Sequence, residues 1–382
     1  MPERRVPVYE PALTAADVDA VTAAVKSGAI ASGPSIGELE SAWSKYCGMP
    51  YGIAVSSGTA ALELAIEALD LSPGDEVLCP TFTIISCVRA ILAAGAMPVL
   101  VDAEPRTFNI DLAAAEKKIG KRTRAILVVH TYGYPVDAVG LARLAGKHGL
   151  TVIEDAAEAH GAEVLRGADR WLRCGAVGHL STFSFYANKA ITCGEGGMVL
   201  ARDRAIADRV RAHRNLCFDK VRRFRHDDVG ANYRITNMQA ALGVAQLSRI
   251  EEILETKRHI AHLYRERLGR LPELEMQANE AWARPVPWMV GVVLRDSVPL
   301  DAAGLAERLA EAGIDTRPFF LGMHEQPAFA KRRLFLDQRY PVAERLSRRG
   351  LYLPSGLDLD LDTIQYVCDE VRAALALSRR RR

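Results

Sequence analysis

The chain has 382 residues, 49% hydrophobic and 25% charged, a composition typical of a folded globular protein rather than a disordered or fibrous one. Its 49 lysines and arginines nearly balance 47 aspartates and glutamates, so the net charge of +2 gives no positive excess for binding nucleic acid. The longest apolar stretch, residues 88–101, is interrupted by Arg89, Gly95 and Pro98. We therefore expect neither nucleic acid nor a membrane as a partner.

The cysteines and histidines give no metal-binding pattern. No Cys-x-x-Cys pair occurs among the seven cysteines, and their odd number favours reduced thiols over disulfides or a zinc site. His259 and His262 could share one helix face, but the charged stretch around them offers no third ligand. We expect a cytoplasmic protein without a bound metal.

From about residue 50 to 200, short β-branched runs alternate with alanine-rich helical runs. This alternation is typical of βαβ units around a buried, mostly parallel sheet, so the fold class is α/β. The helices expected between the strands are 60–69, 83–94, 111–119 and 138–147. The seven expected strands are Tyr51–Val55, Glu76–Cys79, Met97–Val101, Ala125–Val129, Thr151–Glu154, Ser181–Phe185 and Gly197–Ala201.

The pattern changes after residue 202. A charged helix and a loop rich in Arg and Asp precede a periodic run from Thr236 to about Leu268, which predicts one long helix between two domains. The remainder predicts a strand at 288–294, a helix at 301–312, a Pro-rich turn at 317–320 and a final helix at 361–377. We therefore divide the chain into a large domain, residues 1–250, and a smaller α+β domain, residues 251–382.

Three segments carry residues suited to chemistry. The first runs from the apolar strand at 51–55 through a small-residue turn directly into a helix. Gly58 and Thr59 would then present free backbone amides at the helix N-terminus, where anions bind. Alone, this pattern predicts either a phosphate or carboxylate site or an ordinary N-cap.

The second segment is the end of the strand at 151–154, where Glu154 and Asp155 are followed by small residues, Glu158 and His160. A carboxylate at the C-terminal end of a parallel strand lies in the crevice where α/β proteins bind ligands. Asp155 could equally cap the next helix.

The third segment contains Lys189, between an aromatic strand and the Gly-rich turn 194–197. A lysine in such a crowded place is partly desolvated, which lowers its pKa and makes the amine available for a Schiff base. The glycines indicate close backbone approach, which makes a merely solvated lysine a weaker interpretation.

Pyridoxal phosphate needs an amine for its aldehyde, a carboxylate for its ring nitrogen and an anion site for its phosphate. Lys189, Asp155 and the turn at Gly58 and Thr59 could supply these three groups together. No Gly-x-Gly-x-x-Gly follows the first strand, which argues against a dinucleotide-dependent dehydrogenase.

Over nearly its whole length the chain resembles the DegT/DnrJ/EryC1/StrS family of sugar aminotransferases. The resemblance is carried by Ser-Ser-Gly-Thr-Ala-Ala-Leu at 56–62, Pro-Thr-Phe-Thr at 80–83, Glu-Asp-Ala-Ala-Glu-Ala-His-Gly at 154–161, Phe-Ser-Phe-Tyr-Ala-Asn-Lys at 183–189 with Gly-Glu-Gly-Gly after it, and Asn-Tyr-Arg-Ile-Thr-Asn at 232–237.

This resemblance implies a pyridoxal phosphate enzyme of fold type I, with L-glutamate as amino donor. It implies that Lys189 binds the cofactor's aldehyde, Asp155 pairs with the ring nitrogen and Glu158 lies near the ring hydroxyl. The phosphate would be bound by Gly58, Thr59 and Ser184. In the family the residue at the position of Asn232 reaches the phosphate from the partner subunit, so a homodimer with a shared active site is implied.

Two further segments, 130–137 and 317–329, look most like the perosamine-forming branch of the family, which aminates C4 of GDP-4-keto-6-deoxymannose. A nucleotide-linked 4-keto-6-deoxyhexose is therefore the expected substrate. Amination of a 3-keto position, of a TDP- or UDP-linked sugar or of a cyclitol is the alternative. A non-catalytic, cofactor-binding regulatory protein is the alternative from a different class.

The substrate's diphosphate calls for cationic side chains. Arg317 and His324 are the substrate-binding candidates, with Arg234 and the loop 222–225 as further cationic groups, although that loop could simply be solvated. Ile84 stands where the family commonly carries an aromatic residue that stacks on the cofactor. The resemblance therefore implies an aliphatic contact there, without the stabilisation of about 1 kcal/mol that aromatic pairs provide.

Overall fold

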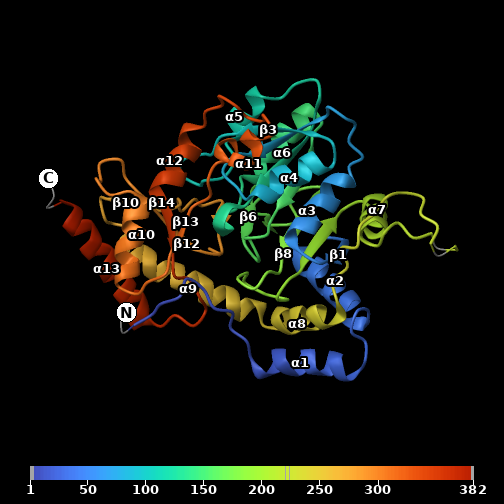
Figure 1. Cartoon of the computed structure of the whole chain (residues 1–382), viewed down its shortest axis with the longest axis horizontal. Helices are drawn as coiled ribbons and strands as arrows, with labels where there is room; N and C mark the ends of the chain where they lie inside the picture. The colour runs from blue at the N-terminus through green and yellow to red at the C-terminus, as the bar shows by residue number, and fades with distance from the viewer. Residues whose placement is uncertain (1–3, 220, 223, 380–382) are drawn as a thin grey trace.

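The computed structural model describes residues 4–219, 221–222 and 224–379 (Figure 1). Its main element is a seven-stranded sheet with the order β1-β9-β8-β5-β4-β2-β3. The pairings among β8, β5, β4, β2 and β3 are parallel, whereas β9 runs antiparallel to both β1 and β8. The strands are β1 Tyr51–Val55, β2 Glu76–Pro80, β3 Met97–Val101, β4 Thr123–Val129, β5 Thr151–Asp155, β8 Leu180–Ser184 and β9 Gly197–Ala201. The predicted mostly parallel sheet is confirmed.

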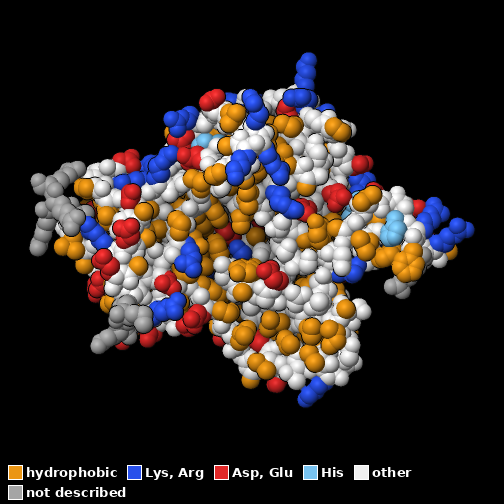
Figure 2. Space-filling model, in the orientation of Figure 1, with side chains coloured by type: hydrophobic (Ala, Val, Ile, Leu, Met, Phe, Trp, Pro, Cys, Tyr) orange, Lys and Arg blue, Asp and Glu red, His pale blue; other side chains and the backbone are white. Residues whose placement is uncertain are grey.

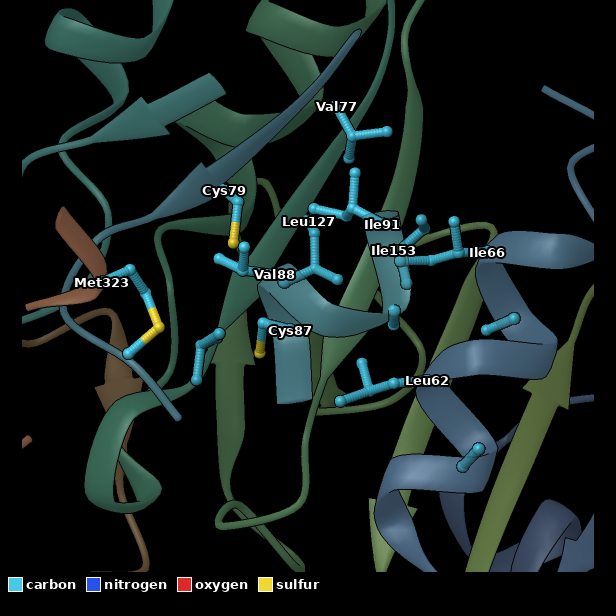
Figure 3. Packing of buried hydrophobic residues seen from close by; sticks show 14 of the residues in the cluster. Leu62, Ile66, Val77, Cys79, Cys87, Val88, Ile91, Leu127, Ile153 and Met323 are labelled. Atoms are coloured by element: carbon cyan, nitrogen blue, oxygen red, sulfur yellow. The ribbon is translucent and has the colours of Figure 1, made fainter. Parts of the chain in front are cut away.

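Both faces of this sheet are covered, which is why its strands are continuous apolar runs. Figure 3 shows one such layer, in which Leu62 of α3 and Val88 of α4 point into the same apolar space as Leu127 of β4 and Ile153 of β5. On the other side, β1, β8 and β9 pack with α2 and α8, and β4 packs with α6. The helices of this part of the chain are α1 Ala15–Lys26, α2 Pro34–Cys47, α3 Gly58–Glu67, α4 Ile85–Ala93, α5 Leu112–Lys117, α6 Ala138–His148, α7 Arg204–Arg214 and α8 Asn237–Ser248.

The single long helix predicted from Thr236 to Leu268 is wrong, because two helices, α8 and α9 (Ile250–Leu268), meet at Arg249. Arg249 leaves the helical conformation, with φ −116° and ψ 22°. Its guanidinium donates to Ala12 O and to the buried carboxylate of Asp17 in α1, 3.1 Å away, and Gln246 donates to the same carboxylate at 2.9 Å. Docking of α1 on the junction therefore accompanies the change of helix direction, and α1 lies beside α8 (Figure 1).

The C-terminal part forms a four-stranded antiparallel sheet with the order β10-β12-β14-β13. The strands are β10 Leu274–Glu275, β12 Val290–Leu294, β13 Arg317–Pro318 and β14 Gly350–Leu353. The predicted Pro-rich turn at 317–320 thus begins with a two-residue edge strand, the sheet position where proline is tolerated. The helices are α9, α10 Ala302–Glu311, α11 Pro327–Ala330, α12 Pro341–Arg349 and α13 Leu361–Arg379.

A third, three-stranded sheet, which the sequence analysis did not predict, has the order β11-β6-β7. It joins β6 Glu163–Leu165 and β7 Trp171–Arg173 to β11 Ala283–Arg284 from the C-terminal part. Val6, near the N-terminus, pairs with Ile314 beyond residue 250, so the chain start contacts the C-terminal part. The division at residue 250 stays a prediction.

In the part of the chain that the structure describes, no helix combines the length and the apolar character that crossing a bilayer requires.

Candidate active site

A cavity of about 370 Å³ opens where several strands of the large sheet end. The parallel strands β4, β5 and β8 end at Val129, Asp155 and Ser184, and all three residues line it, as expected for a ligand site in an α/β fold. The molecular surface is hollowed near the middle of the face in Figure 2, with hydrophobic side chains around the hollow. The predicted residues brought together here are Gly58, Thr59, Asp155, Glu158, Ser184 and Lys189.

Lys189 is the amine of this cavity and is only 8% exposed. Its Nζ lies 3.8 Å from Glu158 Oε1 and 3.7 Å from the centroid of the Trp288 ring. Burial lowers the pKa of the Lys189 amine, while the carboxylates of Glu158 and Asp155 oppose that shift. An amine held this way can act as a nucleophile and as a base.

Asp155 is the last residue of β5 and is almost completely buried. Its Oδ1 accepts the backbone N–H of Ala157 at 3.1 Å, and its Oδ2 accepts the thiol of Cys87 on α4 at 3.3 Å. Burial raises the pKa of Asp155, and the amide of Ala157 counteracts the shift. The protein compensates the negative charge of the buried Asp155 carboxylate poorly, so a cationic ligand placed beside it would be stabilised.

Glu158 follows β5 and contacts both the Lys189 amine and a backbone amide. Its Oε2 accepts the N–H of Tyr132 at 2.8 Å, and burial raises its pKa to about 7. Tyr132 is itself buried and has a positive φ of 56°, an uncommon conformation for a bulky residue. Such strain is typical of functional sites, where surrounding contacts maintain it.

The N-terminus of α3 forms one corner of the cavity. Ser57 caps the helix by accepting the N–H of Ala60 at 3.1 Å, which leaves the amides of Gly58 and Thr59 without an acceptor among the described residues. A Cβ on Gly58 would come within 2.8 Å of Ser184 Cβ, so only glycine lets the helix start this close to β8. The N-cap is therefore observed, and the capped helix end also lines the cavity, while the anion site stays a prediction.

Three predicted site residues do not line the cavity: Asn232, Arg317 and His324. Asn232 is exposed and pairs through its backbone with Asn215. Arg317 is exposed and lies opposite Tyr352 in the β13–β14 pair. The side chain of His324 is only 3% exposed, with Nδ1 2.9 Å from Thr81 Oγ1 and Nε2 3.3 Å from Glu344 Oε1, so partners within the fold engage both ring nitrogens.

The other cationic groups considered for the substrate lie outside the cavity lining as well. Arg222 and Arg225 belong to the segment that extends from α7 at the side of the molecule (Figure 1), and both are exposed. Arg225 pairs with Asp227 at 3.0 Å, and Arg234 donates to Asn215 Oδ1 at 2.7 Å. Arg223, also within the loop 222–225, lies outside the described residues.

Residues 11–372 match the DegT/DnrJ/EryC1/StrS aminotransferase family. The chain belongs to this family. Among its relatives, the GDP-perosamine synthase of Caulobacter vibrioides is 39% identical, in an alignment that covers 96% of this chain and 98% of that protein. The GDP-perosamine synthase of Escherichia coli O157:H7 is 36% identical, over 96% of this chain and 97% of that protein. The crystal structure of the aminotransferase TlmJ from Streptoalloteichus hindustanus is similar with a TM-score of 0.90 at 30% identity, covering 97% of this chain and 99% of that one.

Enzymes of the DegT/DnrJ/EryC1/StrS family depend on pyridoxal 5′-phosphate. The cavity fits this cofactor on three observations. It contains a buried amine at Lys189, a buried carboxylate at Asp155 and unpartnered amides at the start of α3. These donors and acceptors match the cofactor's aldehyde, ring nitrogen and phosphate.

Sequence reasoning missed the aromatic wall of this aminotransferase site, formed by Trp288, Phe320 and Tyr352 around Tyr132. Tyr132 stacks on Phe320 with ring centroids 5.3 Å apart. Tyr132 and Phe320 belong to the two segments, 130–137 and 317–329, that were assigned to the perosamine-forming branch. Nothing local marks Trp288, which lies 100 positions from its hydrogen-bond partner Asn188.

Proposed function

We propose that this aminotransferase moves the amino group of L-glutamate to C4 of a nucleotide-linked 4-keto-6-deoxyhexose, with GDP-4-keto-6-deoxymannose as the favoured acceptor. The observation that carries the proposal is the buried Lys189 amine in a cavity shared with Asp155, Glu158 and the N-terminus of α3. The two relatives described as GDP-perosamine synthases, aligned with almost the whole chain, support the choice of acceptor.

Bound in the cavity, pyridoxal phosphate supplies the electron sink that lets an amino group pass between two substrates. Lys189 would hold it by the aldehyde, Asp155 by the ring nitrogen, and Gly58, Thr59 and Ser184 by the phosphate. Glu158, held by the Tyr132 amide, would lie near the ring hydroxyl. Ile84, at the cavity edge and 47% exposed, would make the predicted aliphatic contact.

Lys189 is the residue that moves protons in this proposal. Burial lowers the pKa of the Lys189 amine and so favours its neutral form, in which Nζ would take the proton from the α-carbon of glutamate. The protonated amine would then pass that proton to the carbon that carried the cofactor's aldehyde. The same two steps run in reverse when the keto sugar is aminated. The Trp288 ring beside Nζ limits the space that the amine can explore and keeps water away from it.

The acceptor's diphosphate would lie toward Arg317. Directly opposed residues of an antiparallel pair project from the same face, so Arg317 shares the face of Tyr352, which lines the cavity. For His324, whose ring nitrogens meet Thr81 and Glu344, we propose a positioning role that anchors the segment before α11 to the large sheet.

A homodimer with a shared site is part of this proposal, and the position of Asn232 supports it. Asn232 does not line the cavity of its own chain, yet Tyr233 beside it is fixed, because its hydroxyl donates to Glu63 Oε2 at 2.6 Å and its carbonyl accepts the N–H of Ser56 at 2.8 Å. An exposed amide on a rigid segment suits a contact with a second copy of the chain.

A cytoplasmic location belongs to the same proposal. All seven cysteines are buried and unpaired in the described structure, as suits a reducing compartment.

The first test is the visible absorption of the purified protein before and after addition of L-glutamate. We expect a band from bound pyridoxal phosphate that bleaches when glutamate is added. Borohydride treatment before glutamate should fix a pyridoxyl group on the peptide that contains Lys189. A band that does not respond to glutamate would overturn the catalytic proposal in favour of a non-catalytic cofactor-binding protein.

The acceptor is tested with a panel of keto sugars added to the glutamate-treated protein. Return of the absorption band with GDP-4-keto-6-deoxymannose, and formation of a 4-amino sugar, is the expected result. Return only with a 3-keto sugar, a TDP- or UDP-linked sugar or a cyclitol would overturn the proposed acceptor and leave the aminotransferase proposal intact.

A further inference from the structure

A second buried lysine lies behind the active-site cavity. Lys257, on α9, is 2% exposed, and its Nζ donates to the carbonyl oxygens of Trp288 at 2.7 Å and Ser355 at 2.6 Å. Among the ion pairs of the described residues none includes Lys257, so the amine is buried without a carboxylate. Burying an amine in this way is costly, and a shorter polar residue or an apolar one would avoid the cost.

One of the two hydrogen bonds of Lys257 is to Trp288, the residue whose ring packs against the amine of Lys189. Trp288 donates its backbone N–H to Tyr132 O at 3.0 Å and its indole N–H to Asn188 O at 2.6 Å. Its ring lies 3.7 Å from Lys189 Nζ, and Lys257 holds its carbonyl. Every polar group of Trp288 is therefore bonded, and the orientation of the indole is fixed from both ends of the residue.

A second connection from Lys257 reaches Lys189 by a different path. Tyr9, whose ring centroid lies 5.2 Å from Lys257 Nζ, donates its hydroxyl to the backbone oxygen of Lys189 at 2.9 Å. Ser355, the other acceptor of Lys257, donates its backbone N–H to Val8 O at 2.9 Å and so holds the segment that carries Tyr9. Through Trp288, Lys257 thus stabilises the ring that packs against the Lys189 amine. Through Ser355 and the segment of Tyr9, it stabilises the backbone of Lys189.

We propose that Lys257 is a positioning residue of the active site, which acts through the carbonyl of Trp288 to keep the indole against the amine of Lys189. The inference rests on the role proposed above for Lys189. A lysine that only stabilised the fold would not need contacts that lead to the cavity, whereas both hydrogen bonds of Lys257 lead to Lys189.

Electrostatics support the same arrangement. Burial lowers the pKa of Lys257 to about 7, and the nearby charge of Lys189 acts in the same direction. The protein therefore keeps two buried amines close enough to influence each other, on opposite sides of Trp288. A methionine at position 257 would fill similar space without the charge or the two hydrogen bonds.

The test measures access to Lys189 in the full-length protein freed of cofactor. Acetic anhydride is applied at alkaline pH, where the lowered pKa of each buried amine favours its neutral form, and the acetylation rate of the Lys189 peptide is followed by mass spectrometry. We expect Lys257→Met to raise that rate roughly fivefold, because the indole is no longer fixed. In a Trp288→Leu background, where no indole is present, Lys257→Met should change the rate little.

Lys118→Met is the matched control. Lys118 also donates to a backbone carbonyl, Leu100 O at 2.6 Å, but its other acceptor is Tyr340, and neither bond is to Trp288 or to Lys189. Its replacement should leave the acetylation of Lys189 unchanged. If Lys257→Met does not fold, Lys257→Gln is measured in its place, since the shorter glutamine side chain cannot maintain the hydrogen bonds to both Trp288 O and Ser355 O.

Two results would overturn the inference: an unchanged Lys189 rate in the Lys257 variant, or the same increase with and without the Trp288 indole. Neither result depends on glutamate or on a keto sugar. Failure of the proposed transamination would therefore be recognised separately, in the absorption experiment.

Discussion

Glu154 and Asp155 are adjacent on β5, yet their carboxylates lie on opposite faces of the sheet. Glu154 accepts the backbone N–H groups of Val177 and Gly178 on Oε1 and that of Gly175 on Oε2. The ring Nε2 of His130 also donates to Oε2, because its Nδ1 accepts the N–H of Val136. Asp155 faces α4 and the cavity, where it meets the Cys87 thiol. Because side chains alternate along a strand, Glu154 holds the loop on one side of the sheet and Asp155 faces the cavity on the other.

Asp155→Asn should therefore affect chemistry more than folding. An amide keeps the shape and can still accept the Ala157 N–H through Oδ1, while its NH₂ faces the Cys87 sulfur, which can accept as well as donate. It cannot provide the negative charge that a cationic ring nitrogen requires. We expect the rate of the half-reaction with L-glutamate to fall about 10²-fold or more, with the unfolding midpoint close to that of the wild type. Stopped-flow absorption measures the rate, and a variant as fast as the wild type would contradict the role proposed for Asp155.

Glu154→Gln should have the reverse effect. Both carboxylate oxygens receive N–H donors, so the amide NH₂ of glutamine would face a donor whichever way it is turned. We expect the free energy of unfolding in urea to fall by about 2 kcal/mol, with activity per folded molecule largely retained. Unchanged stability would show that the loop 175–178 does not depend on this carboxylate.

Glu154 and Asp155 show how much of the fold and the site could be predicted from the sequence. The seven strands were recognisable because each is a short apolar run, and the carboxylate at the end of β5 follows from strand direction. Glu154 was recognisable only as an acid near the strand end, because its function depends on the loop 175–178 and on His130, which lie elsewhere in the chain.

Features that depend on tertiary contacts could not be predicted in this way. The break at Arg249 accompanies contacts with Asp17, more than 200 positions earlier, and helical periodicity carries no information about them. Trp288 was assigned to a strand, but it precedes β12, and its place over Lys189 is set by Tyr132, Asn188 and Lys257. Local sequence preferences therefore predicted the large sheet and its helices, but not the aromatic wall of the cavity.

An aromatic residue at position 84 should strengthen cofactor binding. Ile84 lines the cavity and is 47% exposed, so a larger side chain has room at the opening. We expect Ile84→Phe to lower the Kd for pyridoxal phosphate about fivefold by adding a stacking contact. The Kd is measured by titrating the cofactor-free protein. Ile85→Phe is the control, since Ile85 is also exposed but does not line the cavity; an equal effect at both positions would refute the stacking argument.

Glu158 should make the stability of the cofactor-free protein pH-dependent. Its pKa is raised from 4.5 to about 7 by burial, so the folded state holds this proton more tightly than the unfolded state. Its contribution to stability is thus complete below pH 4.5 and is lost as the pH rises through about 7. Glu158→Gln stays uncharged and should gain on the order of 2 kcal/mol relative to the wild type across this range.

Urea unfolding at the two ends of that pH range measures the difference. Glu163→Gln is a suitable control, because Glu163 lies in the separate three-stranded sheet and pairs with Arg284 away from the cavity. A difference between the Glu158 variant and the wild type that does not grow with pH would contradict a buried, proton-retaining Glu158.

If two subunits share each active site, two inactive variants should restore activity when they are combined. Lys189→Ala removes the amine, and Asn232→Ala removes the amide proposed to reach the partner's cofactor phosphate. In a mixed dimer one site contains both alanines, while the other combines the intact Lys189 of one chain with the intact Asn232 of its partner. Random mixing should therefore give about one quarter of wild-type activity.

The measurement is transamination by the two variants after they are unfolded and refolded together, compared with each variant refolded alone. The double variant Lys189→Ala/Asn232→Ala mixed with the wild type is the control. Every site of its mixed dimer lacks one of the two groups, so only the wild-type dimers, about one quarter of the total, should be active. Recovery of about one quarter of wild-type activity in the first mixture, with no more than about one quarter in the control, requires Asn232 to act across the interface. If Asn232 acted within its own chain, each site of the mixed dimer would carry one defect and no activity would return.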